Sequence, residues 1–257
     1  MEVPGQIVHT MIRVEDIERA VDWYTNHLDY VEHGRSEADT FTLSFLGPEG
    51  AADDPAEPLL ELTYNHDGRS YTMGDAWGHI AVRVDDVQAA YDQLMDEGVE
   101  DYRDPESCGG GYAFVQDPDG HEIEIVERSD GPQWGIDHTM LRVEDADAAI
   151  GWYVRKLDYE LVNRYEHDEF SLYFLKPVDA SPQIMDIELT YNHDERSYEV
   201  GDAWGHLAIA YTDLDDTWDR LMARGAEDYR DPESCGGRYA FTKDPDGHEL
   251  EIVTRSG

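Results

Sequence analysis

The stretch DYRDPESCGG at residues 101–110 decides the fold, because the same letters return at residues 228–237. Around it, ELTYNHD begins at 61 and again at 188, GDAWGH at 74 and 201, and DPDGHE at 117 and 244. Long matches that keep their order along a chain indicate a tandem duplication. We therefore divide the 257 residues into a first domain at 1–128, a linker at 129–135 and a second domain at 136–257. Each domain is long enough to bury a hydrophobic core.

Each half contains a smaller pattern twice. Alternating apolar stretches predict strands, and a segment with helical spacing after an Asp predicts a helix. In the first half, the predicted strands are 9–14, 31–34, 41–46, 59–65, 78–84, 100–102, 112–116 and 121–127, and the predicted helices are 16–28 and 87–97. Residues 48–58 are predicted to form a surface loop, and DPDG at 117–120 a hairpin turn. The predicted fold is α+β, with four βαβββ modules in two domains.

The net charge of −40 is spread along the chain, and lysine occurs only at positions 156, 176 and 243. The aromatic residues and alternating strands argue against a disordered acidic chain. We expect a protein of a salt-loving organism, because concentrated salt screens the repulsion between carboxylates. Nucleic acid and anionic membranes are excluded as partners of such a surface. The sequence also contains no signal peptide and no apolar run that could cross a bilayer, so we expect a cytoplasmic protein.

Each half carries a His, a Glu, a second His and a second Glu in the same order. These residues are His9, Glu61, His79 and Glu124 in the first half, and His138, Glu188, His206 and Glu251 in the second. On a strand, Glu124 faces away from its apolar neighbours Ile123 and Ile125, and a buried carboxylate needs a partner. Two His and two Glu suit Ni, Co, Mn or Fe with water in an octahedral shell, and catalytic zinc also stays open. Cys108 and Cys235 form no Cys-x-x-Cys pair, which argues against structural zinc and a disulfide framework.

Other polar residues have a different expected role. Arg13 and Asn65, repeated as Arg142 and Asn192, share strand faces with the His and Glu residues and suit a carboxylate or amino-acid head group. Four further histidines lie in turns beside Asp or Gly, and we expect them to be solvated: His66, His121, His193 and His248.

The motifs HTMIRV (9–14), LELTYN (60–65), WGHIAV (77–82) and DPDGHEIEI (117–125), with their repeats, resemble glyoxalase I of the vicinal-oxygen-chelate (VOC) superfamily. The resemblance covers almost all of both halves. It implies a metal-dependent isomerisation of the hemithioacetal of methylglyoxal and a thiol, through an enediolate, to an S-lactoyl-thiol. His at the first ligand position is similar to the bacterial enzymes that prefer nickel or cobalt, whereas relatives that prefer zinc carry Gln there.

The resemblance also implies how the residues are shared between two sites. One site is expected to combine His9, Glu61, His206 and Glu251, and the other His138, Glu188, His79 and Glu124. The duplication would then act as an internal dimer in an active monomer. Glu124 and Glu251 would move the proton from C1 to C2, with Glu61 and Glu188 assisting on the other face. The γ-glutamyl end of the thiol would be bound by Arg13, Asn65, Arg142 and Asn192.

One position departs from the family. Cys108 and Cys235 stand where relatives often have a Lys that holds the glycine carboxylate of glutathione. This departure favours γ-glutamylcysteine as the thiol, unless one of Arg103, Arg230 and Arg238 takes over that role. Other members of the superfamily remain as alternatives: an acyl-CoA epimerase, or a binding protein without metal. An extradiol dioxygenase is disfavoured, because its iron takes two His and one Glu.

Overall fold

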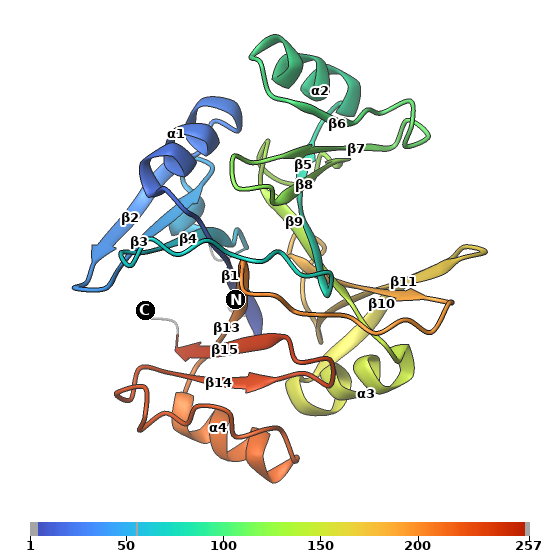
Figure 1. Ribbon diagram of the computed structural model, residues 1–257. Coiled ribbons are helices and arrows are strands. Elements are labelled where there is room, and N and C mark those ends of the chain that lie inside the picture. Colours follow the sequence, from blue (N-terminus) through green and yellow to red (C-terminus); the bar gives the residue numbers. More distant parts are fainter. Residues whose placement is uncertain (1–4, 55, 255–257) are drawn as a thin grey trace.

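The computed structural model describes residues 5–54 and 56–254, which form two mixed β-sheets with helices packed against them (Figure 1). The first sheet has seven strands, in the order β14 (Tyr239–Lys243), β15 (Glu249–Thr254), β13 (Trp204–Tyr211), β1 (Gln6–Arg13), β4 (Leu59–Asn65), β3 (Phe41–Gly47) and β2 (Val31–Glu37). The second has eight, in the order β10 (Tyr159–Glu166), β11 (Phe170–Pro177), β12 (Asp186–Asn192), β9 (Ile136–Arg142), β5 (Trp77–Val84), β8 (Glu122–Glu127), β7 (Tyr112–Gln116) and β6 (Asp101–Arg103).

The sheets do not correspond to the sequence halves. In the first sheet, β1 of the first module pairs antiparallel with β13 of the fourth. In the second sheet, β5 of the second module pairs antiparallel with β9 of the third. Each sheet therefore joins a module from one half to a module from the other, around a central antiparallel pair (Figure 1). The predicted α+β class with four modules in a duplicated chain is confirmed.

Four helices cover the sheets: α1 (Ile17–His27) and α4 (Leu214–Ala223) pack on the first, and α2 (Val87–Asp96) and α3 (Ala146–Leu157) on the second. Each begins after an Asp whose side chain accepts a backbone N–H of the first turn, as an N-cap should. In α1, the buried residues Ile17, Ala20, Val21 and Tyr24 follow the helical period and face the strands. The opposite sheet faces carry the ligand-capable side chains.

The two GDAWGH segments cross each other between the sheets. Gly74 has a φ of +69°, and a Cβ there would lie 2.4 Å from the carbonyl oxygen of Glu199. Gly201 repeats this conformation and approaches Thr72 in the same way. The segments are also hydrogen-bonded, for example from the Asp75 N–H to the Glu199 oxygen at 2.8 Å. Only glycine fits both the backbone conformation and the close approach, so this crossing ties the halves together.

Several details differ from the sequence-based prediction, beginning with β1, which starts at Gln6 and not at residue 9. β2 extends to Glu37, beyond the predicted end at residue 34. Residues Ala51–Asp53 form a short 3-10 helix within the predicted loop. In the described part of the fourth module, a single β-bridge between Arg230 and Phe241 replaces a counterpart of the three-residue β6.

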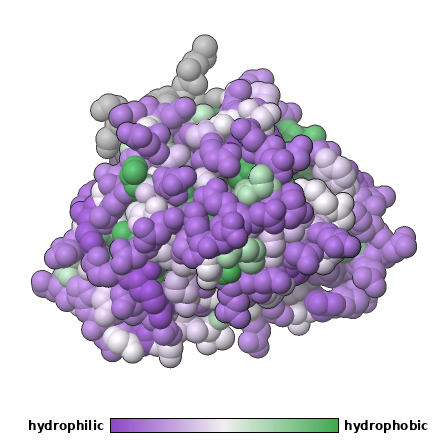
Figure 2. Space-filling model, turned by 90° about the horizontal axis from the view of Figure 1, so that it is seen from above, coloured by the Kyte–Doolittle hydropathy of each residue, from purple (hydrophilic) through white to green (hydrophobic). Residues whose placement is uncertain are grey.

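The surface of the protein is mostly polar, and the linker between the halves makes contacts with the fold. Figure 2 shows a face dominated by hydrophilic residues, with apolar residues only in small, scattered areas. None of the helices in the described ranges is long and apolar enough to span a membrane. The predicted linker is exposed at residues 129–131 but anchored near its end, because Trp134 is buried and its backbone N–H donates to the oxygen of Arg83 at 2.8 Å.

Candidate metal centres

Four neighbouring strands in each sheet bring one ligand-capable side chain each to a common point. In the second sheet these strands are β12, β9, β5 and β8, which carry Glu188, His138, His79 and Glu124. In the first sheet the order β4, β1, β13, β15 aligns Glu61, His9, His206 and Glu251 in the same way. The central antiparallel pair supplies the imidazoles and the outer parallel strands supply the carboxylates. Register shifts beside His9 and His79 mark β-bulges, which frequently aim side chains into sites.

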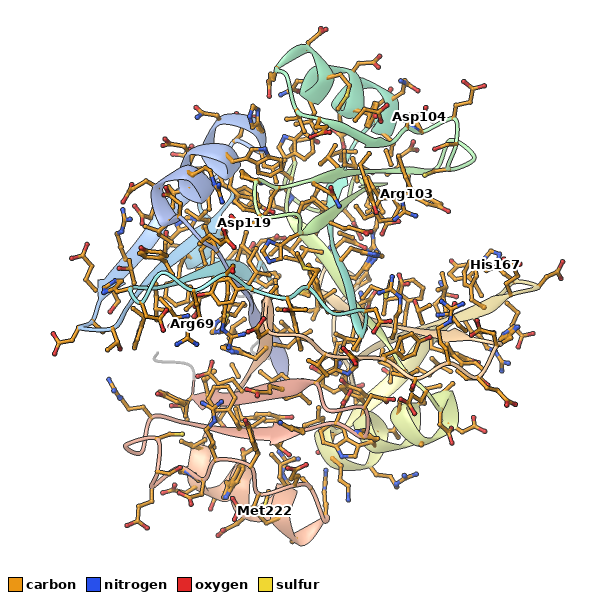
Figure 3. The ribbon with its side chains drawn as sticks, in the orientation of Figure 1. Arg69, Arg103, Asp104, Asp119, His167 and Met222 are labelled. Carbon is orange, nitrogen blue, oxygen red and sulfur yellow. The ribbon has the colours of Figure 1, made fainter. Side chains whose placement is uncertain are left out.

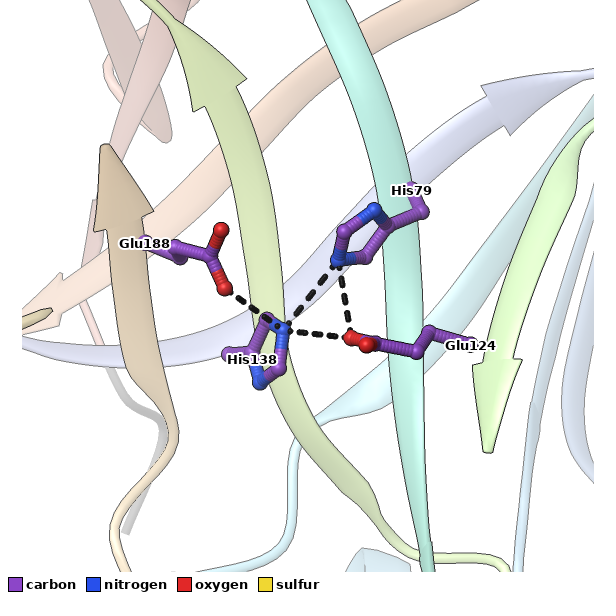
Figure 4. A group of neighbouring side chains, drawn as sticks. All are labelled: His79, Glu124, His138 and Glu188. Carbon is purple, nitrogen blue, oxygen red and sulfur yellow. Dashed lines mark hydrogen bonds and ion pairs between the residues drawn. The ribbon is translucent and has the colours of Figure 1, made fainter. Parts of the chain in front are cut away.

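The centre in the second sheet is compact and buried, and Figure 4 shows its side chains converging. The Nε2 atom of His138 lies 3.0 Å from Glu124 Oε2 and 3.1 Å from Glu188 Oε2. His79 Nε2 lies 3.0 Å from the same Glu124 oxygen and 3.2 Å from His138 Nε2. One donor atom from each residue therefore points into a single small space. We name this group the His138 centre.

The centre in the first sheet repeats this geometry, and we name it the His9 centre. His9 Nε2 lies 3.1 Å from Glu61 Oε2, 3.3 Å from Glu251 Oε2 and 3.1 Å from His206 Nε2. His206 Nε2 also lies 3.3 Å from Glu251 Oε2. The tightest group here consists of His9, Glu61 and His206, with Glu251 slightly farther out. The structure thus brings together the two sets of four that cross the halves.

The imidazoles and carboxylates stabilise each other's charged forms. Burial would raise the pKa of Glu124, but His79 and His138 outweigh burial and hold that pKa well below its usual range. Burial likewise opposes ionisation of Glu251, and His206 and His9 lower its pKa. Burial lowers the pKa of His138, but its bonds to Asp137, Glu124 and Glu188 outweigh burial and raise it well above the usual value. Glu124 and Glu251 are therefore unprotonated at neutral pH and able to bind a cation.

A cavity of about 970 Å³ opens onto the His138 centre. Its lining includes aromatic side chains such as Phe114 and Phe174, and the basic side chains Arg103 and Lys176. Arg103, from β6, and His167, from the hairpin between β10 and β11, lie on opposite walls that come from different halves (Figure 3). A space of this size can hold a peptide-sized or cofactor-sized ligand rather than a small ion alone.

The predicted substrate-binding residues have different surroundings. Arg142 and Asn192 line the large cavity. Arg142 Nη1 donates to the oxygens of Asp75 and Trp77, both at 2.9 Å, which fixes the guanidinium. Arg13 makes the equivalent bonds to Asp202 and Trp204, and it also lines a small pocket of about 150 Å³. Asn65 and Asn192 donate to the hydroxyls of Tyr71 and Tyr198 at 2.8 and 2.6 Å, which leaves their amide oxygens to accept hydrogen bonds.

Comparison with known proteins identifies the family. The model of the Glyoxalase/Bleomycin resistance protein/Dioxygenase superfamily matches residues 6–125 and 135–252. The chain belongs to this superfamily. The lactoylglutathione lyase of Schizosaccharomyces pombe is 30% identical, over 95% of this chain and 95% of that protein. A probable chloroplastic lactoylglutathione lyase of Arabidopsis thaliana is 29% identical, over 96% of this chain and 72% of that protein.

A solved structure extends the likeness to three dimensions. Glyoxalase I from Zea mays superposes with a TM-score of 0.85 at 26% identity, over 97% of this chain and 92% of that chain. The two glyoxalase-like domains of our chain, with sheets that exchange modules between halves, form an intrachain pseudo-dimer. The glyoxalase-like fold expected from the resemblance is therefore confirmed.

The predicted solvent exposure of two turn histidines was wrong for this glyoxalase-family chain. His121 and His248, expected to be solvated, are fully buried, and their Nδ1 atoms lie 2.9 Å from Asp117 and Asp244. The helix residue Tyr24 covers the first pair and donates to Asp117 at 3.0 Å. The turn motif gives no sign of this, because the covering helix comes from another module. His66 and His193 are exposed, as expected.

The sequence analysis also missed a buried charged group beside the His138 centre. Asp137 and Asp186 are buried, as is Lys176, whose Nζ lies 3.4 Å from Asp186 Oδ1. Burial raises the pKa of Asp186 to about 6, although Lys176 opposes the shift. The signal was present in the sequence, since HTM is preceded by Val8 in one half and by Asp137 in the other.

Proposed function

We propose that this chain is a lactoylglutathione lyase (glyoxalase I) that converts the hemithioacetal of methylglyoxal and a thiol into an S-lactoyl-thiol. The observation that carries the proposal is the convergence of two His and two Glu at each of two places on the sheets. Relatives of that name, and glyoxalase I itself, match nearly the whole chain. A second candidate, the acyl-CoA epimerase, gains no support from a particular residue.

Each centre suits a divalent metal. Two carboxylates that meet in a buried space need a cation, because burying like charges together is costly. Two imidazole nitrogens and two carboxylate oxygens leave room for further oxygen ligands in an octahedral shell. We propose Ni²⁺ or Co²⁺ in preference to Zn²⁺, with His9, Glu61, His206 and Glu251 as one ligand set and His138, Glu188, His79 and Glu124 as the other. When bound, the metal supplies a Lewis acid that polarises the substrate oxygens.

The protein's own residues would then move the proton. Glu124 is a buried carboxylate 3.0 Å from both imidazoles of its centre, and from this position we propose that it accepts the proton from C1 of the substrate and returns it to C2. Glu251 would do the same in the His9 centre, where it lies 3.3 Å from both imidazoles. Glu188 and Glu61, on the outer strand opposite, would assist on the other face of the substrate. The two proposed bases are themselves buried, which limits the water around their carboxylates.

The thiol would lie in the large cavity. Arg142 keeps further N–H groups for a carboxylate after its two backbone bonds, and the Asn192 amide oxygen can accept from an amino group. These properties support binding of a γ-glutamyl head group there, with Arg13 and Asn65 as the pair for the other centre. Arg103 pairs with Glu122 at 2.9 Å, so its guanidinium is less available to bind the glycine carboxylate of glutathione. This pairing favours γ-glutamylcysteine over glutathione as the thiol.

The deciding experiment follows the ultraviolet absorbance of the thioester product. Metal-free protein, reconstituted with Ni²⁺, Co²⁺ or Zn²⁺ in molar KCl, is mixed with methylglyoxal and either γ-glutamylcysteine or glutathione. We expect thioester formation with nickel or cobalt and a higher kcat/KM with γ-glutamylcysteine. A clear preference for glutathione would contradict the proposed thiol alone. No product with any metal and either thiol would contradict the proposed function.

Two further points complete the proposal. We propose that the chain acts as a monomer, since both ligand sets already combine modules from its two halves. Light scattering after size-exclusion chromatography would measure the mass against 29.3 kDa. The cytoplasmic location stays a prediction.

A further inference from the structure

The two centres differ in what lies behind the first histidine. The segments around His9 and His138 both read HTM, but the preceding residue is Val8 in the first half and Asp137 in the second. Asp137 is buried, and its Oδ2 lies 2.9 Å from His138 Nδ1. Its other oxygen lies 3.2 Å from Nε of Arg128. One carboxylate therefore connects the histidine to an arginine at the end of the first domain.

The contact with Asp137 fixes which nitrogen of the His138 ring faces the centre. The Nε2 atom faces Glu124 and Glu188, and the Nδ1–H group donates to Asp137. Because Nδ1 is occupied by Asp137, the ring is oriented so that Nε2 is the atom that would bind a metal. A carboxylate behind a histidine ligand also makes the imidazole a better electron donor.

The His9 centre has no equivalent of this carboxylate. His9 Nε2 makes the matching contacts to Glu61 and Glu251, but the Val8 side chain cannot accept a hydrogen bond. Within residues 5–54 and 56–254, no hydrogen bond involves the Nδ1 atom of His9. Its ring orientation is set by packing, for example edge-on against Phe45 at 5.6 Å between centroids.

The two halves also differ in the charged side chains that surround Asp137. Asp186 and Lys176, which pair behind the His138 centre, correspond to Leu59 and Gly47 in the repeat. Lys176 Nζ and Arg128 Nη2 both donate to the Pro182 oxygen, at 2.6 and 3.3 Å. Acidic and basic side chains thus pair with each other in this layer. These contacts hold Asp137 in place beside His138.

We infer that Asp137 is a positioning residue that makes the two centres unequal, so that the His138 centre binds a divalent metal more tightly than the His9 centre. The inference rests on the proposed function, because it requires that the His138 centre and the His9 centre each bind a metal. Loss of such a carboxylate typically weakens metal binding by about 10- to 100-fold, and we expect a difference of that size. At limiting metal, the His138 centre fills first and the protein carries one ion per chain.

The test measures metal affinity and needs no turnover. His206→Ala removes a ligand of the His9 centre and leaves only the His138 centre, whereas His79→Ala leaves only the His9 centre. Metal-free protein of each variant is titrated with Ni²⁺ by calorimetry, with a chelator present in competition. We expect the His206→Ala protein to bind about 10- to 100-fold more tightly than the His79→Ala protein.

Exchange of the differing residues then assigns the cause. Asp137→Val in the His206→Ala background should lower the affinity by about 10-fold or more, and Val8→Asp in the His79→Ala background should raise it. Asp137→Asn serves as the milder variant if Asp137→Val does not fold, and thermal unfolding of the metal-free proteins checks the fold. Equal affinities of the two centres, or no change on losing Asp137, would overturn the inference while leaving the proposed function intact. Failure of every protein to bind Ni²⁺, Co²⁺ or Zn²⁺ would overturn both.

Discussion

Single residues show where sequence reasoning succeeded and where it could not. The His and Glu residues of the two centres could be found because the duplication repeats them at strand positions. The burial of His121 could not be predicted, because the covering Tyr24 lies far away in the sequence. Asp137 escaped attention for a related reason, since it is one of many acidic residues in a chain of charge −40. The difference between Val8 and Asp137 in the two repeats marks the position, but the packing is needed to show that this carboxylate is buried.

We expect His121→Ala to lower the free energy of unfolding by about 3–5 kcal/mol, because it leaves the buried Asp117 carboxylate without its partner. Denaturant titration of the metal-free protein measures the change. It is done at about pH 6, where both members of the pair are charged and the effect is near its greatest. His66→Ala is the control, because His66 is an exposed turn histidine that bonds to the neutral Thr42 hydroxyl at 2.9 Å and, in the described part of the chain, to no carboxylate, and it should cost only about 1 kcal/mol. Equal effects of the two substitutions would contradict the structural role of the pair.

The same pair predicts a dependence on pH. Burial lowers the pKa of His121, but Asp117 outweighs burial and raises it, while His121 outweighs burial and lowers the pKa of Asp117. The histidine's contribution is complete below its unfolded pKa of about 6.5 and falls as pH rises through its folded pKa. The aspartate's contribution is complete above about 3.9 and falls as pH drops through its folded pKa. The difference between wild type and His121→Ala should therefore shrink above about pH 6.5, and a constant difference would contradict the assignment.

The proposed bases can be tested one centre at a time. At saturating metal, Glu124→Gln and Glu251→Gln should each remove about half of the turnover, since each centre has its own base. The double variant should lose about 10²- to 10⁴-fold in kcat, the usual contribution of a positioned acid–base residue. The control is Glu227→Gln, at an exposed position, which should keep full activity. If either single substitution abolished turnover, one centre alone would carry the reaction.

At the level of elements, the strands bounded by turn residues were predicted best. β4 and β7 begin and end where the sequence indicated, because apolar alternation stops at each end. β2 was predicted too short, because its last residues are polar and largely exposed. Its register against β3 is set by pairing and not by a buried face, which a pattern of apolar residues cannot reveal.

The crossing of the GDAWGH segments gives a prediction at this scale. Gly68 and Gly74 share a φ of +69°, but only Gly74 lies close to other backbone atoms. Gly68→Ala should cost about 1–2 kcal/mol of unfolding free energy for its left-handed backbone. Gly74→Ala should cost about 1–3 kcal/mol more, because its Cβ would overlap the Glu199 oxygen. Denaturant titration compares the two, and equal losses would mean that the crossing tolerates a side chain.

The whole molecule combines two folded sheets with a charge of −40. Repulsion between carboxylates opposes compactness, and salt reduces it as the Debye length falls from about 10 Å at 0.1 M to about 3 Å at 1 M. We expect the melting temperature to rise continuously over this range, as measured by circular dichroism or calorimetry. KCl and NaCl should act alike if screening is the cause. A melting temperature that does not change with salt would contradict the expectation of a salt-adapted protein.

The order of the strands also determines how the chain can assemble while it is being synthesised. The second sheet is built from β5 to β12, a continuous stretch of sequence, and it can form while the C-terminal module is still missing. The first sheet cannot close until β13 emerges to pair with β1, almost the full length of the chain later. Contacts between residues far apart in sequence slow folding and leave strand edges exposed in the meantime. The edge of β1 next to β13 thus stays uncovered for most of synthesis, and the nascent chain depends on protection there until β13 arrives.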